Sequence, residues 1–159
     1  MDLDGKWQES TCTDLKPFIC KKRNSYCPVP WEYKWSKTIA TYADAMIECR
    51  QWKGDLASIN GPEEEAAIKK LHPNKRQSWY AAWIGLNDRK GKFVWTDGTG
   101  SNYRNWAYQE PSHTYEEDCV TFRYMKANGN KVNWNDRNCK SKLRYICKRC
   151  YLTRRLDEK

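Results

Sequence analysis

Eight cysteines in a chain of 159 residues constrain this protein more than any other feature of its sequence. The count is even and only two histidines are present, so zinc binding is a poor explanation for all eight thiols. Paired cysteines indicate disulfide bonds, which persist in oxidising compartments. The sequence therefore predicts a disulfide-bonded, extracellular domain. Residues 1–6 are polar and do not form a signal peptide, so we expect a fragment of a longer exported chain.

The composition allows one ordinary domain with a real core and argues against several functional classes. Hydrophobic residues make up 39% of the chain and charged residues 31%, and no apolar run approaches the roughly 18 residues that a membrane span needs. The formal net charge is +9. We interpret the basic clusters as a solvated face, with attraction to anionic glycans or cell surfaces as the alternative. No nucleic-acid-binding motif accompanies this charge, so nucleic acid is not an expected partner.

An internal repeat relates the two ends of the chain. Residues 7–22 and 134–148 carry Trp, Cys, Ile and Cys in the same order and at the same spacing. The offset from Trp7 to Trp134 is 127 residues, and it is constant across all four matches. A period of this size is a plausible length for one domain.

The repeat predicts the domain organisation. We expect residues 1–22 to be the C-terminal remnant of a preceding repeat, residues 27–150 to be one complete domain, and residues 151–159 to be a tail or linker. Cys12 and Cys20 would pair with cysteines of the missing part of the preceding repeat. Neighbouring repeats of the parent chain are therefore expected partners.

The first part of the domain predicts a strand and then a helix. Aromatic and polar residues alternate over residues 31–42, and from Thr41 the apolar spacing becomes helical. We expect Gly54 to end this helix. Its predicted apolar face consists of Ala43, Met46 and Ile47, with Cys49 beside them.

A second helix is predicted to begin at residues 60–63, where Asn60 offers a cap, Pro62 suits the first turn and acidic residues follow. Its predicted apolar face consists of Ala66, Ala67, Ile68 and Leu71.

The remainder predicts an antiparallel sheet with one long functional loop. The loop covers residues 96–118 and is rich in Gly, Asn, Asp and Glu; loops of this length in compact domains are usually functional. Helices first and strands later define an α+β domain. The predicted strands cover residues 79–86, 92–95, 119–124, 131–134 and 143–147.

Together these segments resemble the C-type lectin-like domain family over about residues 27–150. The order of the motifs and cysteines is specific in combination. The residues that carry the match are Ala45, Cys49, residues 56–59 (Leu-Ala-Ser-Ile), residues 83–86 (Trp-Ile-Gly-Leu), Trp106, residues 110–112 (Glu-Pro-Ser), Cys119, residues 134–136 (Trp-Asn-Asp), Cys139 and residues 145–147 (Tyr-Ile-Cys).

The resemblance implies a disulfide framework. Cys49 would pair with Cys147, and Cys119 would pair with Cys139 to clamp the long loop. Cys27 and Cys150 flank the domain and could join its ends, although Cys27 departs from the family's common long form. Connectivity among eight cysteines does not follow from the sequence itself.

The resemblance also implies a calcium site, with Ca²⁺ as the cofactor. Calcium prefers clustered oxygen ligands, and five matching positions all carry oxygen-bearing side chains. Pro111 would follow a cis peptide bond. The family pattern gives as metal ligands Glu110, Ser112, Glu117, Asn135 and Asp136.

A saccharide would bind by direct coordination of two vicinal hydroxyls to this calcium ion. The sugar-binding residues would be Glu110, Ser112, Glu117 and Asn135, with His113 and Tyr115 packing on the sugar or covering the loop. Ser112 departs from the usual Asn of the family's triplet. The order that begins with Glu110 favours mannose-type over galactose-type sugars. A second calcium site is not predicted, because Gly91 and His113 lie where acidic ligands would be expected.

Two functions compete. The first is calcium-dependent binding of a carbohydrate or glycoprotein ligand, and the alternative is a calcium-independent protein-interaction or adhesion module with a vestigial sugar site. An enzyme is not predicted, since only His72 and His113 could serve as a histidine base and no nucleophile pairs with either in the sequence.

Overall fold

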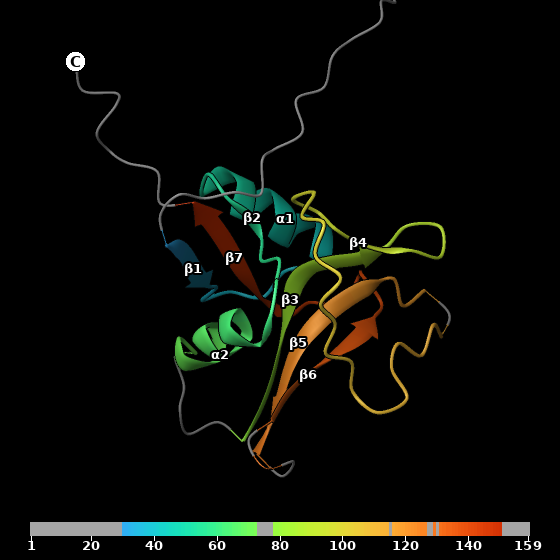
Figure 1. Cartoon of the computed structure of the whole chain (residues 1–159). Helices are drawn as coiled ribbons and strands as arrows, with labels where there is room; N and C mark the ends of the chain where they lie inside the picture. Colours follow the sequence, from blue (N-terminus) through green and yellow to red (C-terminus); the bar gives the residue numbers. More distant parts are fainter. Residues whose placement is uncertain (1–29, 73–77, 115, 127–128, 130, 151–159) are drawn as a thin grey trace, which may run out of the picture.

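The computed structural model describes residues 30–72, 78–114, 116–126, 129 and 131–150 (Figure 1). The predicted remnant at 1–22, the tail at 151–159, Cys27 and Tyr115 lie outside the described residues. None of the described helices is long and apolar enough to cross a membrane. The elements are β1 (Trp31–Trp35), α1 (Tyr42–Gln51), β2 (Asp55–Leu56), α2 (Pro62–Lys70), β3 (Trp79–Asp88), β4 (Phe93–Trp95), β5 (Cys119–Met125), β6 (Lys131–Arg137) and β7 (Arg144–Cys150).

The strands form one sheet in the order β1-β7-β3-β5-β6, with β2 paired to β7 and β4 paired to β3. This confirms the α+β class. One pairing differs from the predicted antiparallel sheet, because β3 and β7 run parallel where Ala82 and Trp83 face Arg144 and Tyr145. The reason is topological: β7 returns to the middle of the sheet after the β5–β6 hairpin, and it pairs with β1 on its other side (Figure 1).

Strand β3 separates two hydrophobic clusters. Side chains alternate across a strand, so Ala82 and Ile84 enter the cluster that contains Ile68 of α2. Trp83 enters the other cluster, with Tyr42 and Cys49 of α1. All three of these β3 side chains are fully buried, which explains why the strand appears in the sequence as a continuous apolar run rather than an alternating one.

The start of α1 is as predicted, but its buried face is not. Thr41 caps the helix by accepting the backbone N–H of Asp44 at 3.2 Å. The predicted face is wrong, since Ala43 is exposed and Ile47 is 51% exposed. The helix is rotated because other side chains tie it to the sheet. Those buried residues are Tyr42, Ala45 and Cys49.

Gly54 does not act as the predicted helix cap. The helix ends at Gln51, and Lys53 takes the left-handed conformation with φ of 64°. Gly54 is instead required for close packing, because a Cβ there would lie 2.5 Å from the carbonyl oxygen of Lys148 on β7.

The prediction for α2 also needs correction. Gly61 is the N-cap and makes no side-chain cap bond; Asn60 instead donates its backbone N–H to Glu64 at 2.9 Å. The predicted face fails because Ala66 and Ala67 are exposed and Leu71 is 52% exposed. Only Ile68 of that set is buried, together with Glu65, whose carboxylate accepts hydrogen bonds from the core.

Two disulfide bonds implied by the resemblance are present. Cys49 is bonded to Cys147, which fastens α1 to β7, and Cys119 is bonded to Cys139. Cys150 is also disulfide-bonded, while its predicted partner, Cys27, lies outside the described residues.

Candidate functional site

The predicted loop is anchored beside the middle of β6. The backbone N–H of Ala107 donates to the carbonyl oxygen of Trp134 at 2.8 Å. The backbone N–H of Trp134 donates to the carbonyl oxygen of Asn105 at 2.7 Å. Trp106 forms an isolated parallel bridge with Trp134. These bonds bring the segment that leads to Glu110 next to the residues that follow Trp134, so positions far apart in the sequence share one site.

Ser112 lies at the centre of a group of three carboxylates. Its backbone N–H donates to Glu110 Oε2 at 2.9 Å and to Asp136 Oδ1 at 3.0 Å. Its hydroxyl donates to Glu117 Oε2 at 3.0 Å. The peptide bond between Glu110 and Pro111 is cis, as the resemblance implies. Four of the five predicted metal ligands therefore lie in one connected hydrogen-bond cluster.

The surroundings of Glu110 and Asp136 shift the pKa values of these two carboxylates in opposite directions. Burial and the neighbouring Asp136 carboxylate raise the pKa of Glu110. Burial also acts to raise the pKa of Asp136, but the N–H groups of His113 and Ser112 outweigh it, and the pKa is lowered. Asp136 is fully buried and thus remains the anionic centre onto which the loop folds.

The fifth predicted ligand, Asn135, is turned towards other protein groups. Its Oδ1 accepts a hydrogen bond from Nη1 of Arg123 at 3.0 Å. Its side-chain amide donates to the carbonyl oxygen of Asp136. The oxygen that a cation would need is thus already in contact with a guanidinium group.

His113 is placed to cover the loop. Its backbone N–H donates to Asp136 Oδ2 at 2.8 Å, and its ring lies 5.4 Å from the ring of Phe93. Nδ1 lies 3.7 Å from Asp88 Oδ2. The imidazole therefore contacts Asp88 and Phe93 in this arrangement.

The donor set fits calcium by its chemistry, because carboxylate, hydroxyl and amide oxygens are the ligands that this ion prefers. The arrangement itself is closed: among the described residues, no three His, Cys, Asp or Glu side chains are grouped so that they could hold a metal ion. The cause is visible in the contacts, since donors of Ser112 occupy the carboxylates and Arg123 occupies Asn135. Calcium would have to displace these donors.

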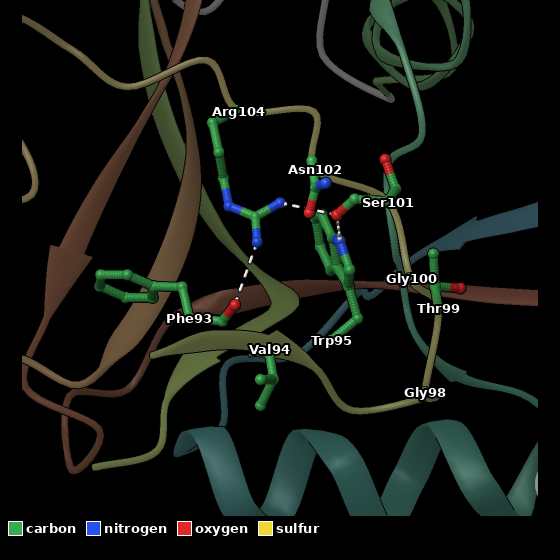
Figure 2. Close-up of a pocket in the computed structure, with 9 residues that line it drawn as sticks. All are labelled: Phe93, Val94, Trp95, Gly98, Thr99, Gly100, Ser101, Asn102 and Arg104. Carbon is green, nitrogen blue, oxygen red and sulfur yellow. Dashed lines mark hydrogen bonds between the residues drawn. The ribbon is translucent and has the colours of Figure 1, made fainter. Parts of the chain in front are cut away.

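A separate pocket of about 300 Å³ lies between β4 and residues 98–104 (Figure 2). Arg104 lines it and donates to the carbonyl oxygens of Ser101, Tyr103 and Phe93 at 3.0, 2.7 and 3.0 Å. Its guanidinium also lies 5.6 Å from the centre of the Trp95 ring. These contacts fasten the first half of the long loop to β4, so Arg104 has a structural role.

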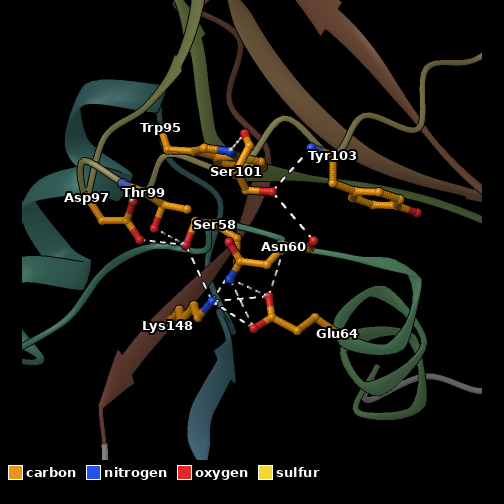
Figure 3. Close-up of polar contacts among 9 residues, drawn as sticks. All are labelled: Ser58, Asn60, Glu64, Trp95, Asp97, Thr99, Ser101, Tyr103 and Lys148. Carbon is orange, nitrogen blue, oxygen red and sulfur yellow. Dashed lines mark hydrogen bonds and ion pairs between the residues drawn. The ribbon is translucent and has the colours of Figure 1, made fainter. Parts of the chain in front are cut away.

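A second polar cluster is buried where α2, β7 and the first residues of the long loop meet (Figure 3). Lys148 is 4% exposed, and its ammonium group lies 3.1 Å from both carboxylate oxygens of Glu64 and from the carbonyl oxygen of Ser58. Ser58 in turn donates to Asp97 at 2.5 Å. Every charge in this cluster has a partner, which favours a structural role in joining α2, β7 and the loop after β4.

Sequence reasoning missed Arg123 and Thr114. Thr114 donates its hydroxyl to Glu117, and nothing in its sequence context marks it. Arg123 could have been found, because a β5–β6 hairpin places residues 121 and 123 opposite 135 and 133, and side chains of such pairs share one face.

The cysteine bonds, the α+β sheet and the oxygen-rich loop define a disulfide-bonded domain with one long polar loop. Residues 38–149 match the family described as Lectin C-type domain, and the chain belongs to this family. Family membership supports carbohydrate binding and no enzymatic activity.

Three similar proteins place the chain within this family. The low affinity immunoglobulin epsilon Fc receptor of Homo sapiens is 35% identical over 142 residues, which span 83% of this chain and 40% of the receptor. The alpha-N-acetylgalactosamine-specific lectin of Patiria pectinifera is 32% identical over 123 residues, or 73% of this chain and 72% of the lectin. A solved calcium-independent type II antifreeze protein is 28% identical with a TM-score of 0.63, covering 79% of this chain and 95% of that one.

Proposed function

We propose that this domain binds saccharides through a calcium ion held by Glu110, Ser112, Glu117, Asn135 and Asp136. The observation that carries the proposal is the convergence of three carboxylates on Ser112. Like charges at such short range repel one another, and a divalent cation would relieve that repulsion. When bound, calcium would supply a positive centre that accepts two vicinal sugar hydroxyls.

The protein groups around the ion would orient the sugar. Glu110 and Glu117 each have oxygens that can accept a hydrogen bond from a sugar hydroxyl, whereas the amide of Asn135 can donate one. Water or sugar hydroxyls would complete the six to eight oxygens that calcium takes. Displacing the internal donors costs free energy, so we expect weak calcium binding, with a Kd of roughly 10⁻⁴ to 10⁻³ M.

The proposed sugar class is mannose-type, based on the family order that begins with Glu110. The name of the Patiria pectinifera lectin, which specifies alpha-N-acetylgalactosamine, favours the galactose type instead. Both classes therefore belong in the test. The proposal also places the domain outside the cell. Its expected neighbours are further repeats of the parent chain, inferred from the 127-residue offset.

The test compares calcium with a chelator. Calcium should raise the thermal midpoint of the domain, because a ligand that binds only the folded state stabilises it. It should also be needed for retention on immobilised mannose or galactose. Glu117→Gln should weaken both effects, whereas the same change at the exposed Glu63 should leave them unchanged. A thermal midpoint that does not respond to millimolar calcium would refute the calcium part of the proposal.

A calcium-independent interaction module is the second candidate. The Ser112 hydroxyl and the Asn135 side-chain oxygen are already hydrogen-bonded to other protein groups, which favours this candidate. The similarity to an antifreeze protein described as calcium-independent favours it as well. Tyr108, which is 91% exposed within the loop, would be a contact residue for such a partner. Ligand binding that survives the chelator would favour this candidate.

A further inference from the structure

Arg123 places a positive charge at the edge of the proposed saccharide site. It lies on β5 directly opposite Asn133 of β6, and Thr121 lies opposite Asn135. These four side chains share one face of the β5–β6 hairpin. Nε of Arg123 donates to Asn133 Oδ1 at 3.0 Å, and Nη1 donates to Asn135 Oδ1 at 3.0 Å.

The charge of Arg123 has no acidic partner in the described part of the chain. Both of its hydrogen-bond acceptors are neutral amides, and none of the ion pairs among the described residues includes it. A guanidinium group has five N–H donors in a rigid fork, of which these two bonds use only part. An oxyanion is the group that matches the remaining donors, because carboxylate-like and phosphate-like anions accept two parallel N–H bonds.

The guanidinium is also within reach of a bound sugar. Asn135 is expected to contact both the ion and a sugar hydroxyl, and Arg123 lies one hydrogen bond from its side-chain oxygen. We propose that Arg123 makes this site selective for saccharides that carry an oxyanion, either a sulfate ester or a carboxylate. This inference rests on the proposed function, since it names the ligand class of the same site.

The same contact predicts an effect on calcium. Calcium lies roughly 2.3–2.6 Å from its oxygen ligands, so an ion on Asn135 Oδ1 would lie close to the guanidinium group that already contacts this atom. Two cations on one oxygen repel each other. Arg123 therefore weakens calcium binding in the free protein, and an anionic substituent on the sugar offsets that repulsion. Calcium and an acidic saccharide should thus strengthen each other's binding by equal factors.

The experiment compares the wild type with Arg123→Gln, which removes the charge and keeps most of the side-chain length. Lys126→Gln is the control, because it removes an exposed charge just beyond the C-terminal end of β5. Titration calorimetry in saturating calcium would use three forms of one methyl glycoside: neutral, sulfated at the primary hydroxyl, and oxidised there to a carboxylate. The glycoside would be whichever of the mannoside and galactoside binds more tightly.

The wild type should bind the sulfated or carboxylated form about tenfold more tightly than the neutral one. The larger preference identifies which anion the site favours. The preference should fall to near unity in Arg123→Gln, decrease partly in Arg123→Lys, and persist in Lys126→Gln. Without sugar, Arg123→Gln should bind calcium about threefold to tenfold more tightly, measured by direct titration with the metal alone.

The outcomes separate this inference from the function on which it rests. If the neutral glycoside binds in calcium but neither anion improves binding, or if Arg123→Gln keeps the preference, the inference is wrong and the proposed function stands. If no glycoside binds at all, both are wrong. Unchanged calcium affinity in a folded Arg123→Gln variant would contradict the proposed competition at Asn135.

Discussion

The backbone N–H of Ser112 donates to Oδ1 of Asp136 at 3.0 Å, across 24 positions of the sequence. Asp136 also accepts the N–H of His113 at 2.8 Å and is fully buried. One carboxylate at the end of β6 therefore determines the path of the loop that carries the proposed ligands. The shape of the site therefore depends on this buried anion.

We predict that Asp136→Ala lowers the free energy of unfolding by about 1–3 kcal/mol in the presence of chelator. The N–H of His113 would lose its charged acceptor, and a hydrogen bond to a charged group contributes about 1.5–3 kcal/mol. Urea denaturation would measure the change. Asp118→Ala is the control, because Asp118 is exposed in the same loop. Equal stabilities of the two variants would show that the loop does not depend on Asp136.

Glu65 links α2 to the core through Trp134. Its Oε2 accepts the indole N–H of Trp134 at 2.9 Å, and its Oε1 accepts the side-chain amide of Asn105 at 2.7 Å. Burial raises the pKa of Glu65 above its ordinary value of 4.5, against the lowering effect of these two donors. The folded protein therefore binds the Glu65 proton more tightly than the unfolded chain.

This pKa shift predicts a pH dependence with a definite sign. A group whose folded pKa is raised contributes stability that is full below its unfolded pKa and is lost as the pH rises through the folded pKa. The stability of the wild type relative to Glu65→Gln should therefore fall as the pH increases from about 4 to about 7. Urea titrations of both proteins at several pH values would measure the difference, in which the other carboxylates cancel. A difference that grows with pH would contradict the prediction.

The buried ion pair of Lys148 and Glu64 should affect the free energy of unfolding most when only one of its partners is removed. Removing one partner of a buried ion pair leaves a buried charge, so Glu64→Ala should lower the free energy of unfolding by about 3 kcal/mol. Replacing the remaining ammonium by an apolar group should help, and the double variant Glu64→Ala/Lys148→Met should recover about 1 kcal/mol or more. Chemical denaturation of the wild type, both single variants and the double variant forms a complete cycle. A double variant less stable than Glu64→Ala would show that the ammonium contributes by other contacts.

Gly85 in the middle of β3 should not tolerate a side chain. A Cβ there would lie 2.5 Å from the carbonyl oxygen of Leu56 and 2.9 Å from Oγ1 of Thr96. Gly85→Ala should therefore lower the free energy of unfolding by about 1–3 kcal/mol through overpacking. At Gly100 nothing lies within 4 Å of the added atom, so Gly100→Ala should be close to neutral. Equal effects in thermal denaturation would show that β3 and β2 can move apart at little cost.

The sequence predicts the elements better than their orientation. The strand at residues 79–86, the start of a helix near Thr41 and two cysteine pairs are all present in the structure. The faces of both helices were wrong because pairwise tertiary contacts decide them. In α1, Tyr42 packs edge-on against Trp83 with ring centres 5.6 Å apart, and this contact together with the disulfide of Cys49 outweighs the burial of Ile47.

The candidate site was also predicted only in part. Resemblance names the oxygen ligands, and the structure brings Glu110, Ser112, Glu117 and Asp136 together. Matching the motif alone did not reveal that Asn135 faces Arg123, because this contact follows from the register of the β5–β6 hairpin. A single charged side chain on a neighbouring strand thus changes what the motif predicts.

The last prediction concerns Ser112→Asn. The backbone N–H of Ser112 makes bonds to Glu110 and Asp136, so the substitution keeps them and loses the hydroxyl bonds to Glu117 and Asp136. Asn reaches one atom further and offers calcium an oxygen and a sugar hydroxyl an N–H from separate atoms. A new hydrogen bond beside a charged centre contributes about 1.5–3 kcal/mol, so mannoside binding should strengthen roughly tenfold to hundredfold. Titration calorimetry of both proteins with methyl mannoside and methyl galactoside would measure this. Weaker mannoside binding in the variant, with galactoside binding retained by the wild type, would mean that Ser112 is suited to galactose-type ligands.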